Sequence, residues 1–122
     1  MAERISGAEH EVMEVLWRES PLTAIEVAER VPADRRWSVR TVKTLLSRLL
    51  AKGVLSHEEA GRRYLYRPAV DRDDYVAQES RRLLDRLFGG RATALVAHLA
   101  ERDDLSNTDI AEIEALLKAL KQ

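Results

Sequence analysis

The first half of the chain repeats apolar positions with the period of an α-helix, and this pattern predicts three helices. They cover residues 6–20, 23–31 and 38–53. Ser6 and Thr23 are each followed three residues later by Glu, which is the pattern of a capping box at a helix start. In the second helix the apolar positions are Ile25, Val27, Ala28 and Val31. The third has the clearest apolar stripe, spaced at about 100° per residue: Val39, Val42, Leu45, Leu46 and Leu49.

Directly after the third helix, the spacing changes to alternation, which predicts a β-hairpin. Segments 54–58 and 63–67 are typical of short strands. The residues between them form the predicted turn, in which Gly61 can take the positive φ that tight hairpins need. Alternation places Tyr64 and Tyr66 on one face, where we expect them to pack the hairpin against the helices.

From residue 71 onward the pattern is helical again and contains no strand. A long helix is predicted over 71–88, a short helix over 92–100, and a last helix from Ser106. The short helix is apolar on nearly all sides, so other elements must enclose it. A unit of about fifty residues buries too little surface to be stable alone, so we expect a second copy to complete its core. Packing onto the first half of the chain is the alternative.

These elements define a mostly α protein with a small β-hairpin. Three helices and a hairpin form a winged helix-turn-helix over residues 1–70, and three helices form a dimerisation region over residues 71–122. The residues that we expect to join two copies are the apolar positions of the last three helices: Leu83, Leu87, Phe88, Leu95, Val96, Leu99, Ile110, Ile113, Leu117 and Leu120.

The formal net charge of the 122 residues is −1, which conceals an uneven distribution along the chain. Residues 1–34 have a net charge of −5 and residues 71–122 a net charge of −3. Residues 35–70 carry nine Lys or Arg and two acids, a net charge of +7. A local basic patch of this kind attracts the phosphates of nucleic acid. The patch coincides with the third helix and the hairpin, which in a winged helix contact the major groove and the DNA backbone.

The polar face of the third helix supplies the candidate DNA-binding residues. Arg40 lies at its centre and can bind guanine with two hydrogen bonds, so it is the first candidate for reading a base. Thr44 and Ser47 follow on the same face, where their hydroxyls can meet base edges. The residues better placed for phosphates are Ser38, Thr41, Lys43 and Arg48 on the helix, with Arg62 and Arg63 at the hairpin tip.

Composition argues against an enzyme. The chain has no Cys, and its three histidines, His10, His57 and His98, are far apart. We therefore expect no catalytic residue, no metal site, no cofactor and no small-molecule substrate. We also expect a cytoplasmic protein without a membrane segment, because no apolar run approaches the roughly 20 residues of a membrane span.

Two long stretches resemble the penicillinase repressors of the BlaI/MecI type, which are related to CopY. They are Ile5-Ser6-x-Ala8-Glu9-x-Glu11-Val12-Met13 with Leu16-Trp17, and Trp37-Ser38-x-x-Thr41-Val42-x-Thr44-Leu45-x-x-Arg48-Leu49 with Lys52-Gly53. The likeness continues through Asp71 to Tyr75 and from Leu95-Val96 to Asp104-Leu105-Ser106.

The resemblance implies a homodimer that represses genes, antibiotic-resistance genes among them, from a palindromic double-stranded operator. It implies relief by proteolysis of the C-terminal region, initiated by a membrane sensor that is a zinc metalloprotease. Family repressors are cut at an Asn-Phe bond, and this chain departs from them by having His98-Leu99 there. By position, Ser38, Thr41, Thr44 and Arg48 match the DNA-contacting segment of the family.

A winged helix can also serve as a protein-interaction adaptor that reads no DNA, and this is the alternative function. An adaptor predicts an apolar or mixed surface on the third helix. Arg40, Lys43 and Arg48 on that surface favour the repressor instead.

Overall fold

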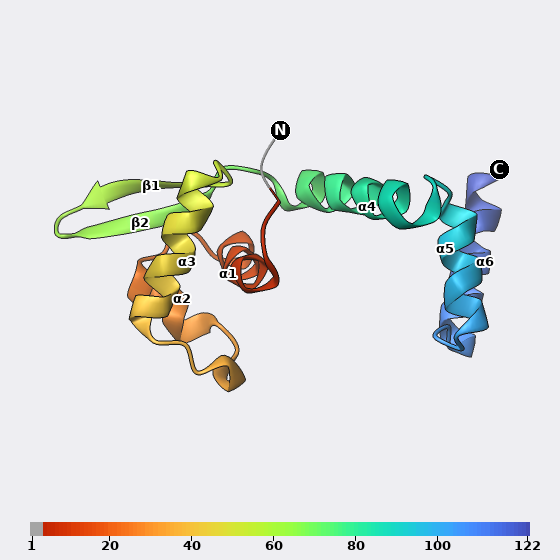
Figure 1. Ribbon diagram of the computed structural model, residues 1–122, viewed down its shortest axis with the longest axis horizontal. Helices are drawn as coiled ribbons and strands as arrows, with labels where there is room; N and C mark the ends of the chain where they lie inside the picture. Colours follow the sequence, from red (N-terminus) through yellow and green to blue (C-terminus); the bar gives the residue numbers. More distant parts are fainter. Residues whose placement is uncertain (1–3) are drawn as a thin grey trace. The chain divides into compact units, whose positions relative to one another are not determined.

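The computed structural model describes residues 4–122 and divides the chain into two compact units, the first ending at Tyr75 and the second beginning at Val76. The first unit contains α1, α2, a short 3-10 helix, α3 and the hairpin strands β1 and β2 (Figure 1). Its elements are α1 Gly7–Arg18, α2 Ala24–Arg30, η1 Ala33–Arg35, α3 Val39–Ala51, β1 Leu55–Ala60 and β2 Arg63–Pro68. They are followed by α4 Arg72–Phe88, α5 Ala92–Glu101 and α6 Asn107–Leu120. The predicted fold class, a winged helix followed by C-terminal helices, is confirmed.

The predicted helix starts of the first unit are confirmed by their hydrogen bonds. Ser6 and Thr23 both form complete capping boxes, with Glu9 and Glu26 respectively as the reciprocal partner. Ser38 accepts a hydrogen bond from the backbone of the first turn of α3. These caps satisfy backbone N–H groups that have no partner within a helix. The first helix ends at Arg18, slightly before the predicted end.

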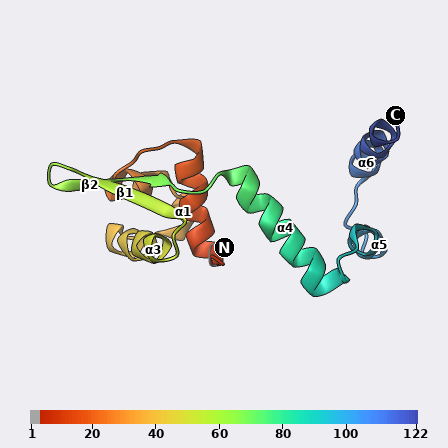
Figure 2. The ribbon, with the colours of Figure 1, turned by 90° about the horizontal axis from the view of Figure 1, so that it is seen from above.

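The hairpin is longer and its turn is tighter than the sequence pattern predicts. Pairing runs from Leu55 opposite Pro68 to Ala60 opposite Arg63, so only two residues remain in the turn. Gly61 is the first of them and has a φ of +67°, which favours glycine at this position. The predicted four-residue turn was therefore wrong, because its first two positions, Glu59 and Ala60, continue β1 and pair with β2. The hairpin extends beyond the helices of its unit in both views (Figures 1 and 2).

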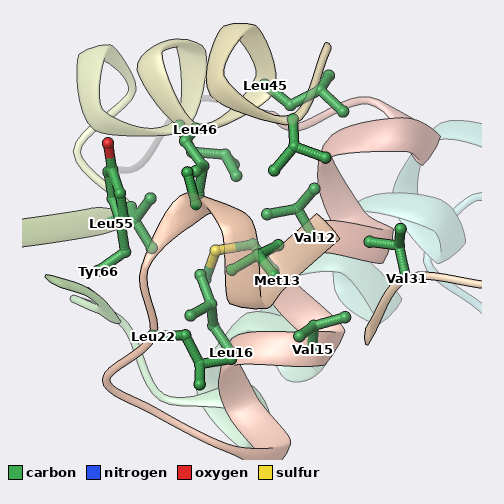
Figure 3. Close-up of a cluster of buried hydrophobic side chains, with 14 of the residues drawn as sticks. Val12, Met13, Val15, Leu16, Leu22, Val31, Leu45, Leu46, Leu55 and Tyr66 are labelled. Carbon is green, nitrogen blue, oxygen red and sulfur yellow. The ribbon is translucent and has the colours of Figure 1, made fainter. Parts of the chain in front are cut away.

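The hydrophobic core of the first unit lies between α1, α2 and α3 and is closed by the base of the hairpin. Figure 3 shows Val12 and Met13 of α1 facing Leu46 of α3, with Tyr66 of the hairpin at one side. The backbones of Leu22 and Tyr66 exchange two hydrogen bonds, of 3.1 and 2.8 Å, and these fix the hairpin to the segment before α2. The core therefore determines how the polar face of α3 and the hairpin are presented together.

One apolar position of the second helix is not part of the core. Ile25 is 49% exposed, whereas the other apolar residues of α2 are buried or half-buried. Its side chain belongs to the first turn of α2 and contributes to the lining of a surface pocket rather than to the core.

A buried ion pair connects the start of α1 to the end of α3. The carboxylate of Glu9, only 1% exposed, accepts hydrogen bonds from Lys52 Nζ at 2.6 Å and from the backbone N–H of Ser6 at 2.7 Å. Burial raises the pKa of Glu9, but the hydrogen bond from Lys52, those from Ser6 and the positive charge of Lys52 together outweigh it. The pKa of Glu9 consequently lies below its usual 4.5. Lys52 also donates to the carbonyl of Arg4 at 3.1 Å.

Replacing Lys52 by Met is expected to lower the free energy of unfolding at neutral pH by about 3 kcal/mol, because it leaves the buried carboxylate of Glu9 without its cation. A lowered folded-state pKa stabilises the fold above the unfolded value and loses that contribution as pH falls. The difference between wild type and Lys52→Met should therefore shrink below about pH 4.5. Urea unfolding at several pH values measures it.

Arg67→Met is the matched control for this prediction. The pair between Arg67 and Glu58 has the same 2.6 Å separation, but both side chains are about half exposed. Its loss should cost at most about 1 kcal/mol. If both variants lower the free energy of unfolding by the same amount, the prediction that the buried pair of Glu9 and Lys52 stabilises the fold more than an exposed pair is contradicted.

The first turn of α4 packs on α1, and for this reason the first unit extends to Tyr75. Trp17 Nε1 donates to the carbonyl of Val70 at 3.0 Å, and Arg72 Nε donates to the carboxylate of Glu14 at 2.8 Å. The ring of Tyr75 lies 5.5 Å from that of Trp17, centroid to centroid. These contacts cross the predicted division after residue 70.

The helices from α4 to α6 bury none of their described residues. Of the ten apolar positions assigned to dimerisation, Leu83, Leu87, Val96, Ile110, Leu117 and Leu120 are exposed, while Phe88, Leu95, Leu99 and Ile113 are half-buried. α5 and α6 overlap in Figure 1 but lie apart in Figure 2, so they do not pack side by side. The expectation that α5 is enclosed is therefore not met within the described residues of one chain.

Candidate nucleic-acid interface

The core fixes which side of α3 faces outward. Val42, Leu45, Leu46 and Leu49 are buried, so the residues between them point to the opposite side of the helix. All the candidates on this face are exposed: Ser38, Arg40, Thr41, Lys43, Thr44, Ser47 and Arg48. The structure thus brings the predicted helix residues together on one surface.

Hydrogen bonds distinguish the hydroxyl groups on this surface. Ser38 Oγ accepts from the backbone N–H of Thr41 and lies 3.1 Å from the hydroxyl of Thr41. Thr44 Oγ1 donates to the carbonyl of Arg40 at 3.1 Å. The hydroxyl hydrogen of Thr44 is therefore occupied, and this residue offers an acceptor and a methyl group to a base edge.

The hairpin adds two cations to the same unit. Arg62 occupies the second position of the two-residue turn and Arg63 begins β2, and both are exposed. Lys43 of α3, Arg62 and Arg63 contribute to the lining of a single pocket, so the helix and the hairpin tip form a continuous basic surface.

The cations of residues 35–70 divide into two groups by their partners. Arg35, Lys52 and Arg67 pair with carboxylates, those of Glu11, Glu9 and Glu58 respectively. Within residues 4–122, the remaining cations form no ion pair: Arg36, Arg40, Lys43, Arg48, Arg62 and Arg63. The unpaired group contains every cation predicted for DNA binding. Arg36 is an addition, because the sequence pattern offered no reason to separate it from Arg35.

The aromatic residues of the unit have different roles. Trp37 is half-buried against the core and has the guanidinium of Arg35 5.8 Å from its ring centroid, which agrees with a packing role. Tyr66 is buried, and burial raises the pKa of its hydroxyl. Tyr64 is 43% exposed and lies in the pocket lining, so the prediction that both tyrosines pack the hairpin onto the body was wrong for Tyr64.

The described residues contain neither a metal-binding cluster nor a membrane-spanning helix. In the described part of the chain, no group of three or more His, Asp or Glu side chains could hold a metal ion. No helix among these residues has the length and apolar character needed to cross a membrane.

The three-helix core, the hairpin and the exposed basic face of α3 define a winged-helix DNA-binding domain. The sequence profile described as penicillinase repressor matches residues 5–119. The chain therefore belongs to the penicillinase repressor family, which consists of repressors and not of enzymes.

Relatives and solved structures agree with this family. The chain is 36% identical over 118 residues to the penicillinase repressor of Bacillus licheniformis, covering 97% of this chain and 92% of the relative. It is 40% identical to the DNA-binding domain of the repressor BlaI, with a TM-score of 0.54 over 62% of this chain and 94% of that one. Another solved structure is the monomeric form of Bacillus licheniformis BlaI in complex with the blaP half-operator. That chain is also 40% identical, with a TM-score of 0.52 over 62% of this chain and 92% of that one.

Proposed function

We propose that this protein is a transcriptional repressor that binds a palindromic operator as a homodimer. Residues 1–70 would read the DNA, and residues 71–122 would join the two copies. The observation that carries the proposal is the group of unpaired cations on α3 and the hairpin tip, in a segment whose other cations are neutralised by carboxylates. An adaptor that reads no DNA would have no need of such a surface.

The roles within the interface follow from position and chemistry. Arg40 reads a base in the major groove, and Thr44 and Ser47 meet neighbouring base edges. Phosphate contacts fix the register of α3 and come from Ser38, Thr41, Lys43 and Arg48. Arg62 and Arg63 hold the DNA backbone beside the hairpin.

Exposed apolar side chains support the dimer. Leu120 is 81% exposed and Leu117 54%, both on the last helix. Leu117 and Leu120 are three positions apart and therefore lie on one face of α6. Exposed apolar side chains on one face favour an interaction site, and a helical unit of this size needs further burial to be stable. A second copy supplies an identical face, as closed twofold symmetry requires.

Release from the operator follows from loss of the dimer. Cutting or loosening the C-terminal unit would separate the two DNA-reading units, and each would then bind a half-site alone. The bond between His98 and Leu99 lies within α5, with His98 exposed and Leu99 half-buried. A membrane sensor-protease system is the proposed source of the signal, by analogy with the family.

Arg40→Ala is expected to weaken binding to the preferred operator by about 1–3 kcal/mol and to relax the base preference at one position. The operator is first selected from a random DNA pool with the wild-type chain. Affinity is then measured for every base at each position, at fixed salt.

Arg40→Lys is the matched control, because it keeps the charge and loses the two-pronged hydrogen-bonding geometry. It should retain general DNA affinity and lose the base preference. If Arg40→Ala weakens all operator sequences equally, Arg40 contacts phosphate and does not read a base. A wild-type chain that selects no sequence would contradict the proposed function itself.

A further inference from the structure

A pocket of about 200 Å³ lies between the start of α2, the middle of α3 and the hairpin tip. Its lining combines three cations, Lys43, Arg62 and Arg63, with apolar and aromatic side chains from Ile25, Tyr64 and Tyr66. No carboxylate is found among the described residues that line it. The pocket therefore combines positive charge with apolar surface.

Two of the apolar side chains that line the pocket, Ile25 and Tyr64, are not part of the hydrophobic core. Ile25 and Tyr64 are 49% and 43% exposed, whereas Tyr66, on the same face of the hairpin as Tyr64, is buried. The ring centroids of Tyr64 and Tyr66 are 6.4 Å apart, so Tyr64 continues the aromatic surface outward from the core. Large apolar side chains left exposed beside unpaired cations indicate a surface that is covered when the protein works.

The chemistry of the lining matches one component of DNA. A backbone nucleotide presents an anionic phosphate and, next to it, a deoxyribose whose carbon atoms are apolar. The phosphate can pair with the three cations of the lining, which are Lys43, Arg62 and Arg63. The apolar carbon atoms of the sugar can pack on Ile25 and Tyr64. The same cations belong to the basic surface that we assign to DNA, so the pocket opens where the backbone would pass.

We propose that this pocket holds one deoxyribose and its phosphate from the operator backbone, which makes Ile25 and Tyr64 DNA-contacting residues. The inference rests on the proposed function and deepens it. Neither residue was a candidate for DNA contact from the sequence, where Ile25 was an apolar position of the second helix and Tyr64 was expected to pack the hairpin onto the helices. The contact carries no base preference, because sugar and phosphate are the same at every position.

The test uses the full chain and the selected operator, together with a duplex of unrelated sequence. Ile25→Ala and Tyr64→Ala should each weaken binding about three- to tenfold, since each removes apolar contact area. The loss should be the same on both duplexes. Neither variant changes the slope of log affinity against log salt, because neither removes a charge, whereas Lys43→Met should reduce that slope by about one.

Conservative replacements are the matched controls. Tyr64→Phe keeps the ring and Ile25→Val keeps most of the apolar surface, so both should bind DNA nearly as wild type does. Arg18→Met removes an exposed cation of α1 that does not line the pocket, and should leave the salt slope almost unchanged. Thermal unfolding verifies that each variant is folded, as expected for substitutions at exposed positions.

Duplexes with a single neutral methylphosphonate locate the phosphate. One linkage in each half-site should weaken the wild-type chain and weaken Lys43→Met by a smaller factor, because only Arg62 and Arg63 are then left to lose their contact with that phosphate. The proposal is overturned if folded Ile25→Ala and Tyr64→Ala bind both duplexes as tightly as wild type. It is also overturned if the pocket resonances shift with inorganic phosphate alone but not with DNA, which would assign the pocket to a free anion. A wild-type chain that binds no duplex would instead refute the proposed function.

Discussion

Removal of residues 76–122 is expected to lower the affinity for an operator with two half-sites by about 10²- to 10⁴-fold. In the dimer, binding of one unit holds the second close to its own half-site, so the second binding event takes place at a high effective concentration. The fragment that ends at Tyr75 keeps the core, the hairpin and the first turn of α4 on α1. The fragment should therefore fold, and its affinity for the operator should fall only because two DNA-binding units are no longer joined.

A single half-site duplex provides the control. Full chain and fragment should bind it with nearly equal affinity, because only one unit can engage. Light scattering should give twice the chain mass for the full chain and the mass of one copy for the fragment. Equal affinities of the two proteins for the complete operator, or a monomeric full chain at high concentration, would refute the proposed dimer.

Leu46→Asp is expected to unfold the N-terminal unit. Leu46 is fully buried, with 0% of its surface exposed, and lies between α1 and α3 (Figure 3). Replacing it removes a large apolar side chain, at about 2–5 kcal/mol, and places an unpaired carboxylate in the core at additional cost. The total approaches the roughly 5–15 kcal/mol that stabilises a typical domain. Near-ultraviolet circular dichroism, which reports the packing of Trp17 and Trp37, should lose its signal.

Ser47→Asp is the matched control, because it introduces the same carboxylate one position along α3 at an exposed site. This variant should remain folded and bind DNA poorly, because a negative charge then faces the phosphates. Loss of folding at Ser47 rather than Leu46 would contradict the assignment of the two faces of α3. Retention of operator binding by Ser47→Asp would contradict the DNA-facing side.

The local elements were predictable because their signals are local. Ser6 and Ser106 begin helices with side-chain caps that involve only the next three residues. The apolar stripe of α3 identified Leu46 and Leu49 as core residues. Because one face of the helix is buried in the core, the opposite face could be predicted to be exposed. The hairpin turn was less predictable, because the pairing of Glu59 and Ala60 with β2 depends on cross-strand hydrogen bonds that periodicity does not reveal.

Contacts between segments that are distant in the sequence could not be predicted from the pattern of apolar and polar residues. Glu9 is recognisable as a capping residue, but nothing in its neighbourhood reveals that Lys52 neutralises it across 43 positions. Ile25 and Val27 are both apolar but lie about 200° apart around α2, so they cannot both face the core. Ile25 lines a surface pocket and Val27 is buried. Their burial differs because α3 and the hairpin cover only part of the surface of α2.

The sequence by itself determined the order of elements, the two faces of α3 and the concentration of positive charge in residues 35–70. These properties arise from spacing and composition, which act between near neighbours. Only the tertiary structure decided which of those cations remain unpaired and which exposed side chains share a pocket with them. Ion pairing and pocket formation depend on distances across the fold, and packing of the core sets those distances.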